Sequence, residues 1–471
     1  MHESLSSIAP RTGVLAAYAG IHFPLSLTSL VVLVYVPVLY GELGIPLALI
    51  GTVLMAARLG DVVTDPLIGW LSDRTHAALG RRKPWVLAGT PLLMISVWML
   101  FVPPEAPSVG YFAFWIVAYY FAFTVADLPY LAWGAELSDS YTGRTAIASW
   151  RELSGFLGKL AATTLPIALV AIGVPGVRDM AIVDAALVLL LLPLSACWLF
   201  RSVPDRPIER AARPSASIAR RLRVIVENGP FMRILTGYTG SLIAGAMDGA
   251  ISFFFCKHAL GIESWYAVAL FVHLLAAVLG IPFWNMLGSR LGKHRALVGA
   301  IVWYACWAFC MPLLTLDALP VWAVAGGFVT LQAAKGFALG SFEALSASMA
   351  ADVIELDAVR TGARRAGVYF SVWGIVKKSA AAFAALVALA GIDLFGFDAT
   401  RDPALVGAPG GNSEQAILAL TILYSFLPSC FKLAVLPILW RYPLTAARLA
   451  RLREAATDAG PADPRPPAAP G

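Results

Sequence analysis

Long apolar runs separated by short polar loops cover most of the chain. Each run has roughly 20 residues, the length that a helix needs to cross the hydrocarbon core of a bilayer. We predict twelve membrane-spanning helices, near residues 14–40, 45–71, 84–103, 110–136, 149–174, 180–200, 230–256, 264–287, 296–314, 319–346, 366–391 and 415–440. The short alternating segments of a membrane β-barrel do not occur. The pattern therefore predicts an all-α membrane protein.

A basic segment that contains proline, roughly Arg201 to Gly229, separates the first six spans from the last six. We expect an N-terminal half at residues 1–200, a linker at 201–229, a C-terminal half at 230–442 and a disordered tail at 443–471, which is rich in Ala and Pro. A weak repeat relates the halves, because Leu71-Ser-Asp-Arg74 is echoed by Leu287-Gly-Ser-Arg290. Two parallel six-helix repeats with the substrate between them are a known transporter plan.

Composition and charge support a membrane location. Hydrophobic residues make up 59% of the chain and charged residues only 14%, whereas soluble domains have about 25% charged residues. The net charge of +6 comes from basic residues that cluster in alternate loops, so it reports topology and not binding to nucleic acid. By the positive-inside rule both termini are cytoplasmic. We expect a multi-pass protein of the cell membrane (the bacterial inner membrane).

No motif for catalysis or cofactor binding is present. The sequence has no Walker A segment, no HExxH, no GxSxG and no His/Cys cluster with metal spacing. Its five cysteines lie in or beside apolar runs without a CxxC pair, and they read as small hydrophobic residues. We therefore expect no enzyme activity, no cofactor and no metal other than a transported Na⁺.

Two carboxylates lie inside the second span, where charge is costly. Asp61 and Asp65 are four residues apart, which places them on one face of a helix. Acids at this depth usually face a cavity and meet a partner. With Thr64 beside them they could supply oxygen ligands for Na⁺, or one acid could hold a proton. The alternative is a structural pair that Arg58 or a lysine of a neighbouring helix neutralises.

The fourth span carries a further acid, Asp127. It could complete the cation site or hydrogen-bond a polyhydroxylated substrate, or it could form a bond between helices. Tyr130 follows one turn later and could stack on a sugar ring. Aromatic residues in spans more often serve packing or interface belts.

Adjacent lysines occur in the eleventh span, at Lys377 and Lys378. Neighbouring residues point about 100° apart on a helix, so we expect only one of them to face the cavity. A lysine opposite the acid pair could neutralise it when the cation has left, which is a coupling role. The alternative is snorkelling to an interface.

Other charged residues in the spans fit structural pairing and substrate contact equally well; they are Lys159, Asp248, Lys335 and Glu343. Asp73, Arg74 and Arg81 lie at the end of the second span and in the loop that follows it. There they predict a cytoplasmic gate.

The run Gly60-Asp61-Val-Val-Thr-Asp65-Pro-Leu-Ile-Gly69-Trp-Leu-Ser-Asp73-Arg74, followed by Gly80-Arg-Arg-Lys-Pro-Trp85, resembles a known family. Asp127-Leu-Pro-Tyr130 and Lys378-Ser-Ala-Ala-Ala-Phe383 fit it as well. The resemblance runs from about residue 12 to 442. It is to the glycoside–pentoside–hexuronide:cation symporters, the melibiose-permease-like family of the major facilitator superfamily.

This resemblance implies a major facilitator fold and coupling to Na⁺, Li⁺ or H⁺ by alternating access. The acids that match Asp61 and Asp65 bind the coupling cation in that family, and the acid that matches Asp127 contributes to cation or sugar binding. The lysine that matches Lys378 lies near them. Arg151 matches an arginine at the sugar pocket. We count Trp373, one turn before Lys377, and Lys378 itself among the candidate substrate contacts.

One departure concerns the substrate. Sugar-binding members carry an acid in the first span, whereas this chain has no acid from Val14 to Gly41. Leu131 also stands where an aromatic residue is expected four residues after Asp127. We predict a monomeric, cation-coupled symporter of a small molecule, a sugar or glycoside. The alternatives are a carrier of lysolipids or other amphiphiles and an uncoupled exporter.

Overall fold

The computed structural model describes residues 11–75, 77–138, 141–174, 176–205, 225–316, 318–361 and 366–444. Within these ranges the secondary structure is helical, apart from one isolated bridge between Ala77 and Gly80. Most of the expected linker, residues 206–224, and the expected tail from residue 445 lie outside the described residues. The proposed domain boundaries at residues 200, 229 and 442 stay predictions.

The helices before the linker form the N-terminal half. They are α1 (Thr12–Gly20), α2 (His22–Glu42), α3 (Leu47–Arg74), α4 (Lys83–Phe101), α5 (Val109–Glu136), α6 (Tyr141–Ala171) and α7 (Val177–Ser202). The C-terminal half has α9 (Gly229–Phe254), which continues as the π-helix η1 (Phe255–Ala259), and then η2 (Glu263–Trp265), α10 (Tyr266–Leu291), α11 (Lys293–Phe309), η3 (Met311–Thr315), α12 (Val321–Thr361) and α13 (Ala366–Leu394). It ends with η4 (Pro403–Leu405), α14 (Glu414–Ser425), α15 (Leu427–Ala434) and α16 (Leu436–Trp440).

Twelve helical segments of the described chain are long and apolar enough to cross a membrane, and they match the expected spans in order and position. The first span combines α1 and α2, and the last combines α14, α15 and α16. Pro428 and Pro437 lie at the starts of α15 and α16. Because proline has no backbone N–H to donate, each interrupts the last span.

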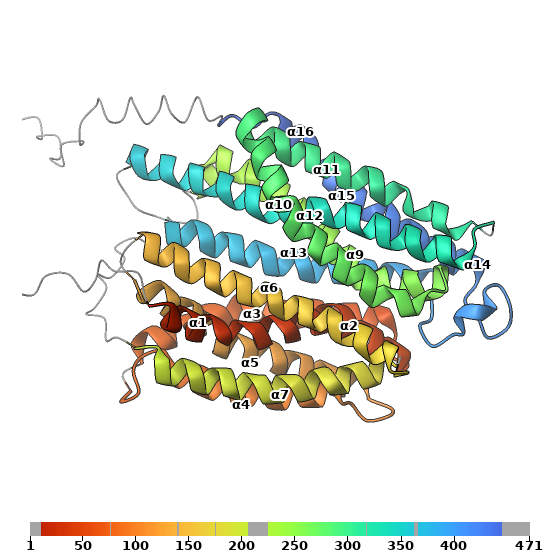
Figure 1. The fold of residues 1–471 in the computed structure, drawn as a ribbon, viewed down its shortest axis with the longest axis horizontal. Helices are drawn as coiled ribbons and strands as arrows, with labels where there is room; N and C mark the ends of the chain where they lie inside the picture. The colour runs from red at the N-terminus through yellow and green to blue at the C-terminus, as the bar shows by residue number, and fades with distance from the viewer. Residues whose placement is uncertain are drawn as a thin grey trace, which may run out of the picture.

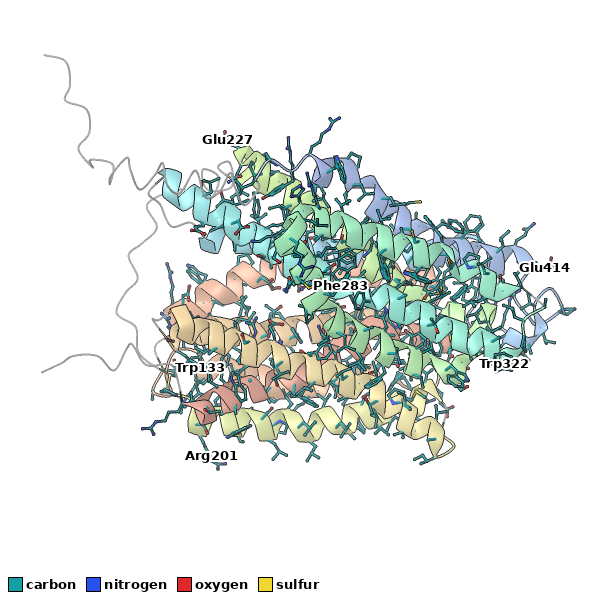
Figure 2. All side chains as sticks on the ribbon, turned by 45° about the horizontal axis from the view of Figure 1, so that its top comes forward. Trp133, Arg201, Glu227, Phe283, Trp322 and Glu414 are labelled. Carbon is teal, nitrogen blue, oxygen red and sulfur yellow. The ribbon has the colours of Figure 1, made fainter. Side chains whose placement is uncertain are left out.

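Figure 1 shows the helices in two groups, the N-terminal half in red to yellow and the C-terminal half in green to blue. The described chain begins and ends at the same end of the bundle, which we call the termini end; the opposite end is the far end. In Figure 2, Arg201 and Glu227 lie toward the termini end, and Trp322 and Glu414 lie toward the far end. Trp322 is 78% exposed, which suits a residue at a membrane boundary.

Glycines allow close packing of α10 against α12 in the C-terminal half. A side-chain methyl group on Gly336 would lie 2.1 Å from the backbone oxygen of His273, and one on Gly340 would lie 2.2 Å from that of Ala277. Any larger residue at these positions would force the two backbones apart. Small residues spaced four apart are typical of tightly packed membrane helices.

The two halves meet where α3 packs along α13. Both helices lie in the middle of the molecule, between the outer helices of the two groups (Figure 1). This contact brings the second span, with its acid pair, next to the eleventh span, with its two lysines.

Candidate cation site

Lys378 of α13 forms ion pairs with both acids of α3. Its Nζ lies 2.6 Å from Oδ2 of Asp65 and 3.3 Å from Oδ2 of Asp61. The three residues therefore bridge the two halves of the protein. The acid pair and this lysine, which the sequence placed on separate spans, belong to one site.

Two further side chains hold the carboxylates in position. Arg58 Nη1 donates to Asp61 Oδ2 at 3.3 Å, and its guanidinium lies 3.8 Å from the centre of the Tyr120 ring. Thr124 of α5 donates through Oγ1 to Asp65 Oδ1 at 3.1 Å. Each acid thus has one partner besides Lys378, Arg58 for Asp61 and Thr124 for Asp65.

Exposure increases from Asp61 to Lys378. The side chain of Asp61 is 4% exposed, that of Asp65 is 23% exposed and that of Lys378 is 35% exposed. Asp65 and Lys378 are therefore the members of the site that a solvated ion reaches first, while Asp61 forms its floor.

Two oxygen atoms beside this pair have no partner. Asp127 Oδ1 and Thr64 Oγ1 are both buried, and neither atom forms a hydrogen bond with any of the described residues. Asp127 lies within electrostatic range of Asp65 and Lys378. Because a buried polar atom without a partner is costly, these oxygens are suitable additional ligands for a cation.

We use the name cation site for Arg58, Asp61, Asp65, Asp127 and Lys378. It contains three acids and two bases, so it lacks one positive charge when every group is ionised. A monovalent cation would supply that charge, and carboxylate and hydroxyl oxygens are hard ligands of the kind that such a cation accepts.

Lys377 takes a different partner from that of its neighbour. Its Nζ lies 3.1 Å from Oε1 of Glu343 on α12, and Tyr238 of α9 donates to Oε2 of the same acid at 3.0 Å. Trp373 stacks on Tyr238 with ring centres 4.1 Å apart. The Lys377 and Glu343 side chains are 54% and 53% exposed. We expected only one of the two lysines to face the cavity, but both are accessible, each next to its own acid.

Tyr130 does not join this site. It is completely buried, its hydroxyl donates to the backbone oxygen of Tyr18 at 3.0 Å, and its ring stacks on Tyr18 at 4.5 Å. Gly134 leaves room for Tyr18, because a methyl group there would overlap the tyrosine hydroxyl. Tyr130 packs α5 against Tyr18 of α1, and its expected contact with a substrate stays a prediction.

Arg151 belongs to α6 of the N-terminal half. Its Nη2 lies 2.5 Å from Oε1 of Glu152, and its Nε is buried without a hydrogen bond among the described residues. Arg151 also lies within electrostatic range of Asp127. Arg151 is therefore a basic residue close enough to the cation site to influence one of its acids.

Two of the residues expected to form a gate, Asp73 and Arg81, lie around Arg82 at the termini end. Arg82, buried, contacts Asp73 Oδ1 and Glu136 Oε1, both at 2.6 Å, and donates to Ser72 Oγ at 2.7 Å. Burial alone would disfavour its charge, but the hydrogen bonds to Glu136 and Asp73 outweigh this and raise the pKa of Arg82. Arg81 also pairs with Glu136. Asp73 and Arg81 thus belong to a network within the N-terminal half.

The guanidinium of Arg74 lies 4.0 Å from the centre of the Trp70 ring. Lys293 and Asp352, 2.5 Å apart, form a corresponding pair within the C-terminal half. These ion pairs at the termini end each stay within one half.

Asp248 and Lys335 form a separate buried pair. Lys335 Nζ lies 2.6 Å from Asp248 Oδ1 and 3.3 Å from the Tyr424 hydroxyl, and both charged side chains are less than 10% exposed. Lys432, also fully buried, lies against the rings of Tyr304 and Phe342. This cluster is closed to solvent, so of the open candidates only Lys159 and Glu343 are accessible.

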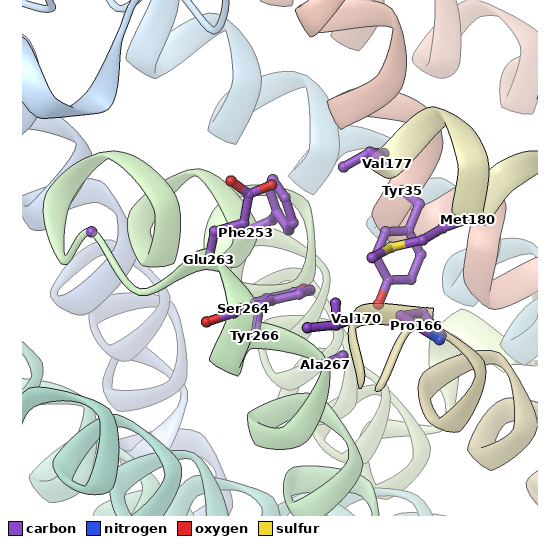
Figure 3. Close-up of a pocket in the computed structure, with 11 residues that line it drawn as sticks. Tyr35, Pro166, Val170, Val177, Met180, Phe253, Glu263, Ser264, Tyr266 and Ala267 are labelled. Atoms are coloured by element: carbon purple, nitrogen blue, oxygen red, sulfur yellow. The ribbon is translucent and has the colours of Figure 1, made fainter. Parts of the chain in front are cut away.

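The halves are joined at the far end by a second bridge. Lys257 of η1 lies 2.5 Å from Glu42 of α2 and 3.5 Å from Glu263 of η2. A pocket of about 280 Å³ lies beside it, and Figure 3 shows Tyr35, Phe253, Glu263 and Tyr266 among its lining residues. Its lining includes none of the cation-site residues.

Three contacts were not expected from the sequence. Thr124 precedes Asp127 by one helical turn. This spacing places both residues on one face of the helix and was the signal by which Thr124 could have been recognised. Glu136 and Arg82 lie far apart in sequence, as do Glu42 and Lys257. No local pattern pairs residues at such separations.

Twelve spans in two groups, with an ion-paired site where the groups meet, define a polytopic membrane transporter of the major facilitator type. The model of one family, described as MFS/sugar transport protein, matches residues 17–446. The chain belongs to this family. Its members are transporters, which confirms that the chain is not an enzyme.

Relatives with curated names are similar over most of the chain. A protein of Synechocystis named as an uncharacterized symporter is 25% identical, over 95% of this chain and 97% of its own length. The putative glycoside/cation symporter YagG of Escherichia coli is 24% identical over 86% of both chains. The human sodium-dependent lysophosphatidylcholine symporter 1 is 24% identical over 64% of this chain and 60% of its own length.

Solved structures support the fold. The crystal structure of the nucleoside transporter NupG superimposes with a TM-score of 0.62 at 14% identity, over 92% of this chain and all of the other. At this identity the likeness concerns the fold alone.

Proposed function

We propose that the protein is a cation-coupled symporter in which Na⁺ or H⁺ and the ammonium of Lys378 compete for Asp61 and Asp65. The observation that carries this proposal is the position of Lys378 Nζ, 2.6 Å and 3.3 Å from the two acids, on the opposite half of the protein. In the absence of a coupling ion the lysine neutralises the acids. An arriving ion takes its place.

The competition couples ion binding to conformation. Because Lys378 and the acids belong to different halves, replacing the lysine removes an ionic bridge between the halves. An ion can drive a conformational change only by its differential affinity for the two states. Here the ion favours the state in which Lys378 has left the acids, and this state is the one that binds substrate.

A sugar or glycoside is the proposed substrate. The family description and the glycoside/cation symporter relative support it. The alternative is a lysolipid or another amphiphile, which the lysophosphatidylcholine symporter relative and the lack of an acid between Val14 and Gly41 favour. An uncoupled exporter would leave the carboxylate–lysine bridge without a role.

We also propose that the protein lies in a bacterial inner membrane as a monomer with both termini cytoplasmic. The basic residues concentrated in the loops at the termini end support this orientation. In it, the bridge between Glu42 and Lys257 lies at the outer surface.

Transport into proteoliposomes tests the proposal. Uptake of labelled sugars, glycosides and lysolipids is measured with an inward gradient of Na⁺ or H⁺ and with no gradient. The wild type should show gradient-driven uptake of one class, and Asp65→Asn should abolish the dependence on the gradient. Gradient-driven uptake at the wild-type rate in Asp65→Asn would reject the proposal.

A further inference from the structure

Lys159 carries a charge that the protein does not pair. Its side chain is exposed although it lies within the fifth span, and it forms no hydrogen bond or ion pair within the described ranges. Glu343, Lys377 and Glu152 lie within electrostatic range of it. Glu343 and Lys377 belong to the opposite half, so Lys159 is influenced by charged side chains across the boundary between the halves.

The position of Lys159 follows from the face of α6 that carries it. Arg151, Gly155 and Lys159 follow one another at intervals of four residues, which places them along one stripe of the helix. His22 rests against this stripe, because a methyl group on Gly155 would lie 2.5 Å from its ring. The stripe therefore runs from Arg151, near the cation site, to Lys159, toward Glu343 and Lys377.

We use the name inner charge cluster for Arg151, Glu152, Lys159, Glu343 and Lys377. Two ion pairs exist within it, Arg151 with Glu152 and Lys377 with Glu343. Lys159 is left over. With three bases and two acids, the inner charge cluster has a net charge of +1. The cation site, with three acids and two bases, has the opposite net charge.

We propose that the inner charge cluster binds an anionic group of the substrate, a carboxylate or a phosphate, between Lys159 and Lys377. The two ammonium groups repel each other across the boundary between the halves, and an anion between them removes this repulsion. The bound anion neutralises the excess positive charge of the inner charge cluster. The coupling ion neutralises the excess negative charge of the cation site. When a monovalent cation and a monovalent anion are both bound, each of the two sites has equal numbers of positive and negative charges.

The neighbouring aromatic pair indicates which chemical group adjoins the anionic part of the substrate. Trp373 lies one turn before Lys377 and stacks on Tyr238, and Tyr238 donates to Glu343. A ring face beside a charged pair suits a molecule that joins an anionic group to a sugar ring or an alkyl chain. This inference rests on the proposed function and narrows its substrate class.

Matched pairs of compounds test the inference. Melting temperatures of the purified protein are measured with glucose against glucuronate, and with a monoacylglycerol against the lysophosphatidate of the same chain length. We expect the anionic member of one pair to bind at least about tenfold more tightly than its neutral counterpart. The pair that responds identifies the source of the anion, a sugar acid or a lysophospholipid.

Two variants of Lys159 complete the test. Lys159→Gln should lower the affinity for the anion to that for the neutral compound, and Lys159→Arg should retain the preference. Equal binding of both members, binding of neither anion, or an unchanged preference in Lys159→Gln would overturn the inference. The response of the same samples to Na⁺ and to pH without substrate reports on the cation site separately. If that response is absent in the wild type, the proposed coupling fails whatever the result for the anion.

Discussion

Lys378 donates to Asp65 at 2.6 Å across the boundary between the two halves, from a position 313 residues further along the chain. Two helices, α3 and α13, bring the groups together. Because the pair is only partly exposed, its charges interact more strongly than they would in free solution. The bond therefore stabilises the empty protein in the conformation seen here and competes with any cation that approaches the acids.

Removing the lysine should make cation binding tighter. In Lys378→Gln the acids lose their internal counter-charge, so the Na⁺ concentration that gives half of the thermal stabilisation should fall roughly tenfold or more. Net coupled transport should be lost, since the empty site can no longer be neutralised. Lys377→Gln is the matched control, because that lysine pairs with Glu343. An equal increase in cation affinity in both variants would show that the effect is not specific to Lys378.

Thr124 positions Asp65 without lying in its helix. Thr124→Val keeps the shape of the side chain but loses the hydrogen bond to Asp65 Oδ1. We expect the apparent cation affinity to fall by about 10–100-fold, the usual effect of removing a partner that orients a ligand. Thr124→Ser keeps the hydroxyl and should stay near the wild type. Calorimetric titration with the cation measures the affinity of both variants. A similar loss of affinity in both would show that the packing of Thr124, and not its hydrogen bond, supports the site.

The ion pair between Glu42 and Lys257 links the two halves at the far end, and we predict that it favours closure there. Both side chains are less than a third exposed, so breaking the pair in Lys257→Gln should cost about 1 kcal/mol and shift the population roughly fivefold toward conformations that are open at this end. Distances between spin labels on the far ends of the two halves measure the shift. The charge swap, Glu42→Lys with Lys257→Glu, should restore closure. A swap that stays as open as the single variant would contradict an electrostatic latch.

Arg82 is the structural centre of the termini end of the N-terminal half. Arg82→Gln removes the ion pairs of Arg82 with Asp73 and Glu136, so we expect a loss of about 3–5 kcal/mol in unfolding free energy. Arg82→Lys should recover little, because an ammonium cannot reproduce the guanidinium fork that reaches Ser72, Asp73 and Glu136 together. Thermal melts in detergent rank the stabilities of these variants. We expect the melting temperature of Arg81→Gln to lie closer to that of the wild type.

The spans could be predicted from the sequence because the length and apolarity of a membrane helix are local properties. The shared face of Asp61 and Asp65 followed from their spacing of four residues in the same way. Their partner did not follow. Helix geometry predicts which face of α13 carries Lys378 and which carries Lys377, but the packing of α3 on α13 decides which lysine meets the acids.

The packing of Tyr130 could not be predicted from the sequence either. Its position one turn after Asp127 is visible in the sequence, whereas the contact that buries it comes from Tyr18 on another helix. Lys159 is the opposite case. Its lack of an acid partner can be recognised only when the ion pairs of its neighbours, Glu152 and Glu343, have been assigned.

The central claim is that a coupling cation displaces Lys378 from Asp61 and Asp65. The most direct test is the melting temperature of the wild type and of Asp65→Asn, measured over a range of Na⁺ concentrations at acidic and alkaline pH, with choline keeping the ionic strength constant. Binding to the folded state raises its stability by mass action. The account predicts that Na⁺ or acidification stabilises the wild type and that this difference disappears in Asp65→Asn. An identical response of the two proteins to Na⁺ and to pH would contradict it.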